Sequence, residues 1–592
     1  MRRTTWVWAR RAAVGLAGAL ATAGLTGTAP AAATPAADLD VIVRTAAPAD
    51  AAAAGAAVRR LGGAVGRPLD VISGFTARVP RAAVPALRAA PGVAAVTADA
   101  PVRLKAAAPP APTGEKWRDD GGKGAHPAAI KKAATKPGPR GGPDAGALTG
   151  AGIGVAMIDS GVTPVAGLDG PGKVVQGPDL SFESQAPDLA GLDTYGHGTH
   201  MAGIIAGSDA ATPAGAARFD GVAPGARIVS LKVAAADGAS DVSQVLAAID
   251  WVVAHRDDKD LNIRVLNLSF GTDTTQDPRL DPLSYAVESA WRKGIVVVVS
   301  VGNDGAEAPR VTMPAANPYV IAVGAVDGRG TDDRADDRVA AFSSRGSATR
   351  HADVVAAGTS VVSLRTPGSY IDNAYPSARL ADAAGEPRLF RGSGTSQAAA
   401  VVSGTVALLL QQRPALTPDQ VKRLLVDSAD PIAGADSVAA GAGQVDLGGA
   451  AALAVPGPKE ATQAYPAATG LGSLDASRGT ARVADESGAE LTGERDIFGS
   501  PWDARRWAPQ AREGKSWKDG TWNGNTWTGR DFTGPPGNRR WATGEWTGRS
   551  WTGRSWTSDN WTGRSWTGRS WTGRSWTTGT WFGRSWTGRS WS

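Results

Sequence analysis

Four polar residues in glycine-rich surroundings carry the strongest signal of chemistry in this sequence. Asp159 lies in MIDSG, His197 in GHGTHMAG, Asn303 in VGNDG and Ser396 in GSGTSQAAA. A serine hydroxyl at its ordinary pKa is a poor nucleophile, so acyl transfer from serine needs a base in contact with it and a carboxylate that orients the base. These residue types therefore indicate nucleophilic catalysis, with Asn303 as a side-chain donor to an oxyanion. The chain has no cysteine, which excludes a thiolate nucleophile, a disulfide framework and a cysteine-ligated metal.

Each of these residues has an ordinary structural explanation when it is taken alone. Asp159 and Asn303 would serve as turn residues, and Ser396 would cap a helix. His197 and His200 are spaced i, i+3, which would place two imidazoles on one helical face, but no HExxH pattern or third ligand accompanies them. We therefore predict no metal site and a packed, hydrogen-bonded His200. The catalytic interpretation depends on the joint occurrence of the motifs.

The elements that must position these residues are predicted between about residues 150 and 455. Short β-branched runs alternate there with helical patterns, which is typical of an open parallel sheet with helices on both faces, an α/β fold. Ligands of such sheets gather beyond the carboxyl ends of the strands, where Asp159 and Asn303 fall. The expected strands are 153–158, 228–233, 265–269, 295–301, 320–326 and 354–357, and the expected helices are 242–254, 283–293, 397–411 and 418–428.

The four motifs, in the order in which they occur, resemble the subtilase family, the subtilisin-like serine peptidases. The matching segments are DSG at Asp159, GHGTHMAG at His197, the pair Gly302 and Asn303, and GTSQAAAVVSG at Ser396. The resemblance implies that Asp159 orients His197 and that His197 takes and returns the proton. It further implies that Ser396 attacks the peptide carbonyl while Asn303 helps hold the oxyanion.

The resemblance also implies that a polypeptide substrate binds as an extended strand between two backbone segments. The substrate-binding residues would be Ser269, Phe270 and Gly271 on one side, Gly238, Ala239 and Ser240 on the other, and Gly302 beside the oxyanion asparagine. The chemistry requires no cofactor. Calcium stabilises many members of the family, but no oxygen-ligand spacing here assigns a site. We expect a monomer.

The N-terminal region has the layout of a secretory signal. Arginines at positions 2, 3, 10 and 11 precede a small, apolar run and then residues that permit cleavage near positions 31–33. The run is too short and too rich in alanine and glycine for a membrane anchor, so we predict export with no transmembrane segment in the mature chain. Sec and twin-arginine export both remain open.

Residues 40–104 combine β-like runs with helical stretches, which fits a compact α+β module. Their GF element at Gly74 and Phe75 and the segment PGVAAVTAD resemble the subtilase propeptide. The resemblance implies an intramolecular inhibitor that is later clipped off.

The last hundred residues hold most of the 21 tryptophans, and from Trp546 the unit WTGRS repeats. A period of five matches neither a helix nor simple strand alternation, so this low-complexity segment is predicted to be flexible or loosely β-like. Tryptophan beside arginine offers stacking surfaces and positive charge, which suit cell-wall polymers, or single-stranded nucleic acid. A spacer without a ligand is the alternative.

The predicted organisation is a signal peptide (1–33), an inhibitor-type propeptide (40–104), a linker (105–146), a subtilisin-like catalytic domain (147–455), a second linker (456–500) and a Trp/Arg-rich tail (501–592). The predicted function is a secreted serine endopeptidase, extracellular or cell-wall associated, made as a self-processed zymogen. The alternative is an exported binding or scaffold protein whose protease-like domain is inactive and whose tail attaches it to the wall.

Overall fold

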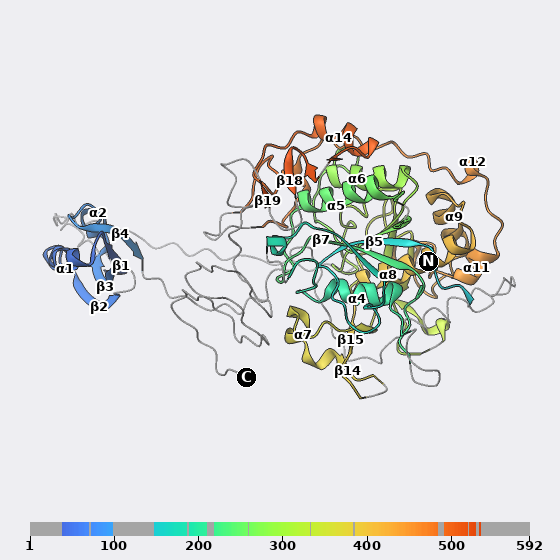
Figure 1. The fold of residues 1–592 in the computed structure, drawn as a ribbon, viewed down its shortest axis with the longest axis horizontal. Coiled ribbons are helices and arrows are strands. Elements are labelled where there is room, and N and C mark those ends of the chain that lie inside the picture. Colours follow the sequence, from blue (N-terminus) through green and yellow to red (C-terminus); the bar gives the residue numbers. More distant parts are fainter. Residues whose placement is uncertain are drawn as a thin grey trace, which may run out of the picture. The chain divides into compact units, whose positions relative to one another are not determined.

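The computed structural model describes residues 38–69, 73–98, 147–185, 189–209, 218–258, 260–331, 333–382, 385–483, 490–518, 520–527 and 532–533. The chain divides into two compact units, one ending at Ala107 and the other beginning at Ala108 (Figure 1). The predicted signal peptide, the 105–146 linker and the WTGRS repeats lie outside the described residues.

The first unit is a four-stranded antiparallel sheet with the order β2-β3-β1-β4 and two helices. Its core contains Val41, Val43, Val58, Phe75 and Leu87, which are drawn from both strands and helices. The predicted α+β module is present. Its elements are β1 (Asp38–Thr45), α1 (Ala51–Arg60), β2 (Ala64–Leu69), β3 (Gly74–Pro80), α2 (Val84–Arg88) and β4 (Val93–Ala98).

The second unit is built on an eight-stranded sheet with the order β11-β10-β9-β8-β5-β7-β6, in which β12 also pairs with β10. Its pairings are parallel except that of β11 with β10. The strands are β5 (Gly154–Asp159), β6 (Val174–Asp179), β7 (Arg227–Lys232), β8 (Ile263–Leu268), β9 (Val296–Ser300), β10 (Ile321–Asp327), β11 (Arg338–Val339) and β12 (Val354–Ala357). All six predicted strands are present, and the predicted fold class is confirmed.

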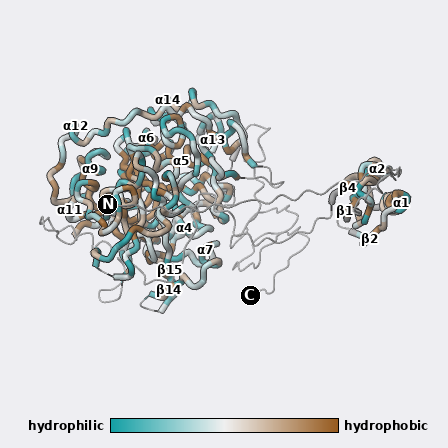
Figure 2. The backbone as a smooth tube through the Cα atoms, turned by 180° about the vertical axis from the view of Figure 1, so that it is seen from behind, coloured by the Kyte–Doolittle hydropathy of each residue, from teal (hydrophilic) through white to brown (hydrophobic). Residues whose placement is uncertain are grey.

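Helices cover both faces of this sheet (Figure 1). α5 (Val242–His255) and α6 (Pro282–Arg292) pack together on one face, and α4 (His197–Ala206) and α8 (Thr395–Gln412) pack on the other. α9 (Pro418–Ser428) and α11 (Leu447–Ala452) lie beside α8. Their start points follow capping chemistry, because Asp241 and Thr417 complete capping boxes at α5 and α9 and Asp281 caps α6. The hydrophobic segments concentrate in the interior of this unit (Figure 2).

A smaller sheet with the order β13-β15-β14 adjoins α4 through β13. Its strands are β13 (Val361–Leu364), β14 (Arg379–Leu380) and β15 (Leu389–Gly392), and α7 (Tyr370–Ala374) and α10 (Ser437–Ala440) are short helices of the same unit. Among the described residues, no helix combines the length and the apolar character needed to span a bilayer.

The described part of residues 456–500 differs from the predicted linker, because it is folded against the rest of the second unit. It contains α12 (Pro458–Ala461) and α13 (Leu474–Ser477), and Leu474, Val483 and Phe498 belong to the core of the second unit. These apolar residues are spaced singly among glycine, serine and charged residues. Such spacing has neither the helical nor the strand period, so no packing was predicted from it.

The beginning of the predicted tail is also folded. α14 (Ala504–Glu513) packs against α6, and β16 (Trp517–Lys518) packs against α5. β17 (Thr521–Trp522), β18 (Asn525–Trp527) and β19 (Phe532–Thr533) complete a four-stranded antiparallel sheet with β16. Asp250 of α5 accepts hydrogen bonds from the indoles of Trp507 (2.7 Å) and Trp522 (2.8 Å). This part of the tail is therefore a cap over α5 and α6.

Candidate active site

The predicted functional residues meet where the order of the sheet reverses. In the sheet, β7 and then β6 lie on one side of β5, and β8, β9 and β10 follow in that order on the other side. The carboxyl ends of β5, β7 and β8 therefore border the point at which open α/β sheets bind their ligands. A cleft lies there, and its volume is about 650 Å³ when the space that opens to solvent is included. Predicted residues that line it are Asp159, His197, Gly238, Ser240, Ser269, Phe270 and Asn303.

The remaining predicted residues adjoin this cleft without lining it. Ser396 lies in the chain between Gly394 and Gln397, which both line the cleft. Ala239, Gly271 and Gly302 are the chain neighbours of lining residues.

The imidazole of His197 contacts the carboxylate of Asp159. Asp159 ends β5 and His197 begins α4, and Nδ1 lies 2.8 Å from Oδ1 and 3.0 Å from Oδ2. Only 11% of the His197 side chain and 5% of the Asp159 side chain are exposed. A proton on Nδ1 is held by the carboxylate in this arrangement, which makes Nε2 the basic nitrogen of the neutral ring.

Asp193 organises the backbone in front of His197. Its Oδ1 accepts from the N–H of Gly196 (2.6 Å) and the hydroxyl of Ser160 (2.8 Å), and its Oδ2 accepts from the N–H of Thr199 (2.7 Å). The carboxylate thus satisfies donors at the start of α4 that have no partner within the helix. Gly196 has a φ of +104°, a conformation that favours glycine, directly before His197. Burial raises the pKa of Asp193 although these hydrogen bonds oppose the shift.

A buried lysine that was not predicted, Lys232, binds the backbone beside Asp159. Lys232 Nζ lies 3.0 Å from Glu183 Oε2, and the two side chains are 0% and 1% exposed. Lys232 also donates to the carbonyls of Ser160 (2.7 Å) and Ala234 (2.8 Å). Burial alone would lower its pKa, but the charges of Glu183, Asp179 and Asp193 outweigh burial and raise it. A lysine inside the apolar strand IVSLKV was the available signal, because a buried charge requires partners.

Burial also raises the pKa of Asp179 in this cluster, to about 6, against the opposing charge of Lys232. The carboxylate accepts from the N–H groups of Ser181 (2.9 Å) and Gly191 (2.8 Å). Since Gly191 precedes the α4 motif, the cluster connects β6 and β7 to the loop that carries His197.

Ser396 and Asn303 meet at the N-terminus of α8. Ser396 is the second residue of this helix and is 1% exposed. Asn303 Oδ1 accepts from the N–H (2.9 Å) and the hydroxyl (3.1 Å) of Thr395, which fixes the amide against the helix end. Gly302 has a φ of +101°, so the turn that presents Asn303 favours glycine. Backbone N–H groups in the first turn of α8 lack partners within the helix and carry the positive end of its dipole.

His200 has the packed role that was predicted for it. It is fully buried, and its Nε2 lies 3.1 Å from the carbonyl of Phe390. Burial lowers its pKa to about 3, so the ring stays neutral. In the part of the chain that the structure describes, no group of three or more His, Cys, Asp or Glu side chains could hold a metal ion.

Comparison with known proteins identifies the two units. Residues 150–465 match the model of the family described as "Subtilase family". The chain belongs to the subtilase family. Residues 23–99 match the model described as "Putative peptidase inhibitor domain", so the first unit of this subtilase is an inhibitor-type domain. Both resemblances inferred from the motifs are thereby confirmed.

The similar proteins are serine proteases. The serine protease AprX of Bacillus subtilis (strain 168) is 36% identical over 50% of this chain, and the match spans 66% of the length of AprX. Subtilisin DY of Bacillus licheniformis is 33% identical over 51% of this chain and 92% of its own sequence. The crystal structure of fervidolysin from Fervidobacterium pennivorans, a keratinolytic enzyme related to subtilisin, matches with a TM-score of 0.41 and 23% identity, over 71% of this chain and 62% of that one.

Two further side chains border the subtilase cleft. Tyr195 and Ile371 line it, and Tyr195 stacks on Tyr370 with ring centroids 5.7 Å apart. Tyr195 lies in the loop before α4 and Ile371 in the short helix α7, and neither belongs to one of the four motifs. Their place at the site depends on packing between the loop before α4 and the helix α7, which no local sequence pattern predicts.

Proposed function

We propose that this protein is a secreted serine endopeptidase that hydrolyses polypeptides through Asp159, His197 and Ser396. The observation that carries the proposal is the contact of His197 Nδ1 with both oxygens of Asp159, at 2.8 and 3.0 Å, beside the cleft that the helix of Ser396 borders. A carboxylate, an imidazole and a serine at a helix N-terminus are the parts that acyl transfer requires.

In the proposed mechanism His197 Nε2 removes the proton of Ser396 Oγ as this oxygen attacks the peptide carbonyl. Asp159 stabilises the imidazolium that forms, and His197 then returns the proton to the leaving amine, which leaves an acyl-enzyme. Water attacks this ester by the same proton transfers and releases the acid. Thr395 donates to Oδ1 of Asn303, so Nδ2 is the end of the amide that would meet the oxyanion, together with the backbone N–H of Ser396.

The substrate would lie as an extended strand between Gly238–Ser240 and Ser269–Gly271. This placement is supported by residues of both segments that line the cleft, namely Gly238, Ser240, Ser269 and Phe270. The buried hydroxyl of Ser240 has no hydrogen-bond partner among the described residues, and a bound peptide would supply one.

We further propose that the inhibitor-type domain acts on its own catalytic domain and that the chain clips it off after export. The match of residues 23–99 to a peptidase inhibitor supports the inhibitory role. N-terminal sequencing of the mature enzyme would identify the processing site.

Replacing Ser396 with alanine tests the activity. The variant should lose casein hydrolysis and should accumulate with residues 40–104 still attached. Exchange of the exposed Ser437 for alanine is the matched control and should leave both unchanged. Casein hydrolysis by Ser396→Ala at the rate of the unaltered chain would exclude the serine mechanism and would favour an exported binding or scaffold protein.

Attachment to cell-wall polymers is proposed only for residues beyond 533. The side chains of Trp502, Trp507, Trp522 and Trp527 are buried against the second unit and are unavailable for stacking on a polymer. The Ser396→Ala chain and the same chain ended at residue 533 should therefore differ in retention on purified walls. Equal retention would discard the attachment.

A further inference from the structure

The segment Ser473–Thr480, here named the brace, contacts the chain just beyond both proposed substrate-binding segments. It lies after residue 465, where the match to the subtilase family ends. It includes α13 and the buried Arg478.

On one side the brace binds the residues that follow Gly271. The hydroxyls of Thr272 and Thr274 donate to the carbonyls of Ser477 (2.8 Å) and Ala476 (2.6 Å). Between them, Asp273 accepts from the N–H and the hydroxyl of Thr480, both at 2.7 Å. The chain leaving this wall of the cleft is thus tied to the brace at three successive residues.

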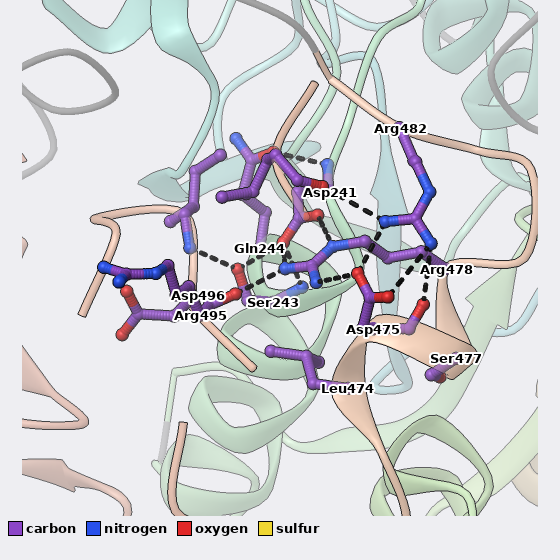
Figure 3. A network of polar contacts seen from close by, with 12 residues as sticks. Asp241, Ser243, Gln244, Leu474, Asp475, Ser477, Arg478, Arg482, Arg495 and Asp496 are labelled. Atoms are coloured by element: carbon purple, nitrogen blue, oxygen red, sulfur yellow. Dashed lines mark hydrogen bonds and ion pairs between the residues drawn. The ribbon is translucent and has the colours of Figure 1, made fainter. Parts of the chain in front are cut away.

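On the other side the brace binds the residue that follows Ser240. Arg478 Nε lies 2.6 Å from Asp241 Oδ2 and its Nη2 lies 3.3 Å from Oδ1, and both side chains are 0% exposed (Figure 3). Asp241 is also the N-cap of α5, since Oδ1 accepts from the N–H of Ser243 at 2.9 Å. The ion pair therefore fixes the point at which this wall of the cleft turns into a helix.

The remaining donors of Arg478 bind backbone carbonyls of the described segment 490–500. Nη1 donates to Gly493 (3.0 Å) and Nη2 to Arg495 (2.5 Å), and Asp475 lies 3.6 Å from Nη1 (Figure 3). The planar guanidinium thus binds two carbonyls of one backbone segment and the carboxylate of Asp241 in a single geometry. A buried ion pair is weak evidence for stability, because apolar side chains of similar volume often stabilise a fold as well. The two-point contact of Arg478 with Asp241 does, however, fix the position of one side chain relative to the other.

We propose that the brace sets the spacing of the two walls that hold the peptide, with Arg478 as a positioning residue. The proposal rests on the proposed function, because it concerns the substrate of the same cleft. The contacts described above join the brace to the residues that follow Gly271 and Ser240, so it acts on the binding of an extended peptide and leaves the acyl-transfer groups in place. The substrates affected are peptides that occupy several positions before the scissile bond.

Kinetics with two substrates test this role in the full, processed enzyme, with concentrations set by active-site titration. One substrate is a tetrapeptide anilide, which spans both walls, and the other is an acetylated single-residue ester, which does not. Arg478→Met should lower kcat/KM for the anilide by about 10- to 100-fold, mainly through KM, because small displacements of positioning groups have effects of this size. Its hydrolysis of the ester should stay within twofold of the unaltered enzyme.

Two variants accompany it. Arg478→Lys keeps the charge without the fork and should recover part of the anilide activity. Arg482→Gln is the matched control. Arg482 lies just after the brace, and its ion pair (2.6 Å) is with Asp475 of the brace and not with Asp241. It should leave both substrates unchanged.

A parallel loss on both substrates, or no loss on the anilide, would overturn the proposal. Should Arg478→Met fail to fold, the double variant Thr272→Val and Thr274→Val is judged by the same criteria, since it removes two of the three contacts of the brace with this wall and strands no charge. Failure of the proposed function is a separate result, in which the unaltered enzyme hydrolyses neither substrate or Ser396→Ala still hydrolyses them.

Discussion

Replacing Lys232 with methionine should lower the free energy of unfolding of the second unit by about 3–5 kcal/mol, the usual effect of removing one partner of a buried ion pair. Lys232 Nζ lies 3.0 Å from Glu183 in full burial, and it donates to the carbonyls of Ser160 and Ala234. Methionine has a similar length, so the change removes the charge without a large cavity. Glu183 is left buried with no cation.

The loss of stability should depend on pH, and its sign follows from the pKa values of the buried Asp179 and Asp193, which lose the charge of Lys232. Burial raises the pKa of Asp193, and without Lys232 one of the effects that oppose this shift is lost. A carboxyl of this kind adds stability below the unfolded pKa, and that stability is lost as the pH rises through the folded pKa. Asp179, whose pKa burial already raises from 3.8 to about 6, follows the same rule. The free energy of unfolding of Lys232→Met should therefore fall further below that of the parent at pH 8 than at pH 5.

Urea unfolding followed by tryptophan fluorescence measures both effects. The parent is the Ser396→Ala chain, which in the proposed mechanism cannot digest itself. The double variant Lys232→Met with Glu183→Gln is the control and should recover much of the loss, because neither charge remains. A loss below about 1 kcal/mol at pH 8, or an equal loss at both pH values, would refute the interpretation of Lys232 as the cation of this cluster.

Four further predictions concern the oxyanion side and the tryptophan cap. Asn303→Ala should lower kcat for a peptide anilide by about 100- to 1,000-fold, the size of effect measured for an oxyanion-hole asparagine in subtilisin, with KM little changed; a change below tenfold would contradict its role. Gly302→Ala should lower both kcat and the melting temperature, since φ is +101° and the new Cβ would come 2.8 Å from Thr312; an unchanged variant would show that the turn is adaptable. Asp250→Ala should red-shift the tryptophan emission and open the cap to trypsin, because the indoles of Trp507 and Trp522 lose their acceptor. Burial raises the pKa of Asp250 to about 6, so the cap of the unaltered chain should resist trypsin better at pH 5 than at pH 8; equal resistance would contradict this assignment.

The residues of the proposed triad stand out in the sequence because their signals are local. Asp159 ends an apolar strand run, His197 directly follows the N-cap glycine of α4, and Ser396 is the second residue after the N-cap glycine of α8. A few neighbouring residues therefore indicate each setting. The order of the motifs then supplied the resemblance. The strands and helices of the sheet were predictable for a related reason, since their apolar runs are long and continuous.

The supporting charges could not be predicted, because their partners are distant in sequence. Lys232 pairs with Glu183 across the connection between β6 and β7, which contains α4, and Arg478 pairs with Asp241 at a separation of 237 residues. Nothing in the sequence around Arg478 distinguishes it from an exposed arginine. Its burial follows from the packing of α13 against α5 and α6, which depends on tertiary contacts.

The end of the family match at residue 465 is therefore not the end of the folded catalytic body. Removal of the chain beyond it would leave Asp241 and Asp250, which are 0% and 2% exposed, without Arg478 and the indoles that satisfy them. Both carboxylates belong to α5, one at its N-cap beside the cleft and the other under the cap of tryptophans. The same helix thus connects the C-terminal segments to a wall of the cleft, which gives these segments a physical route by which to influence how a peptide binds.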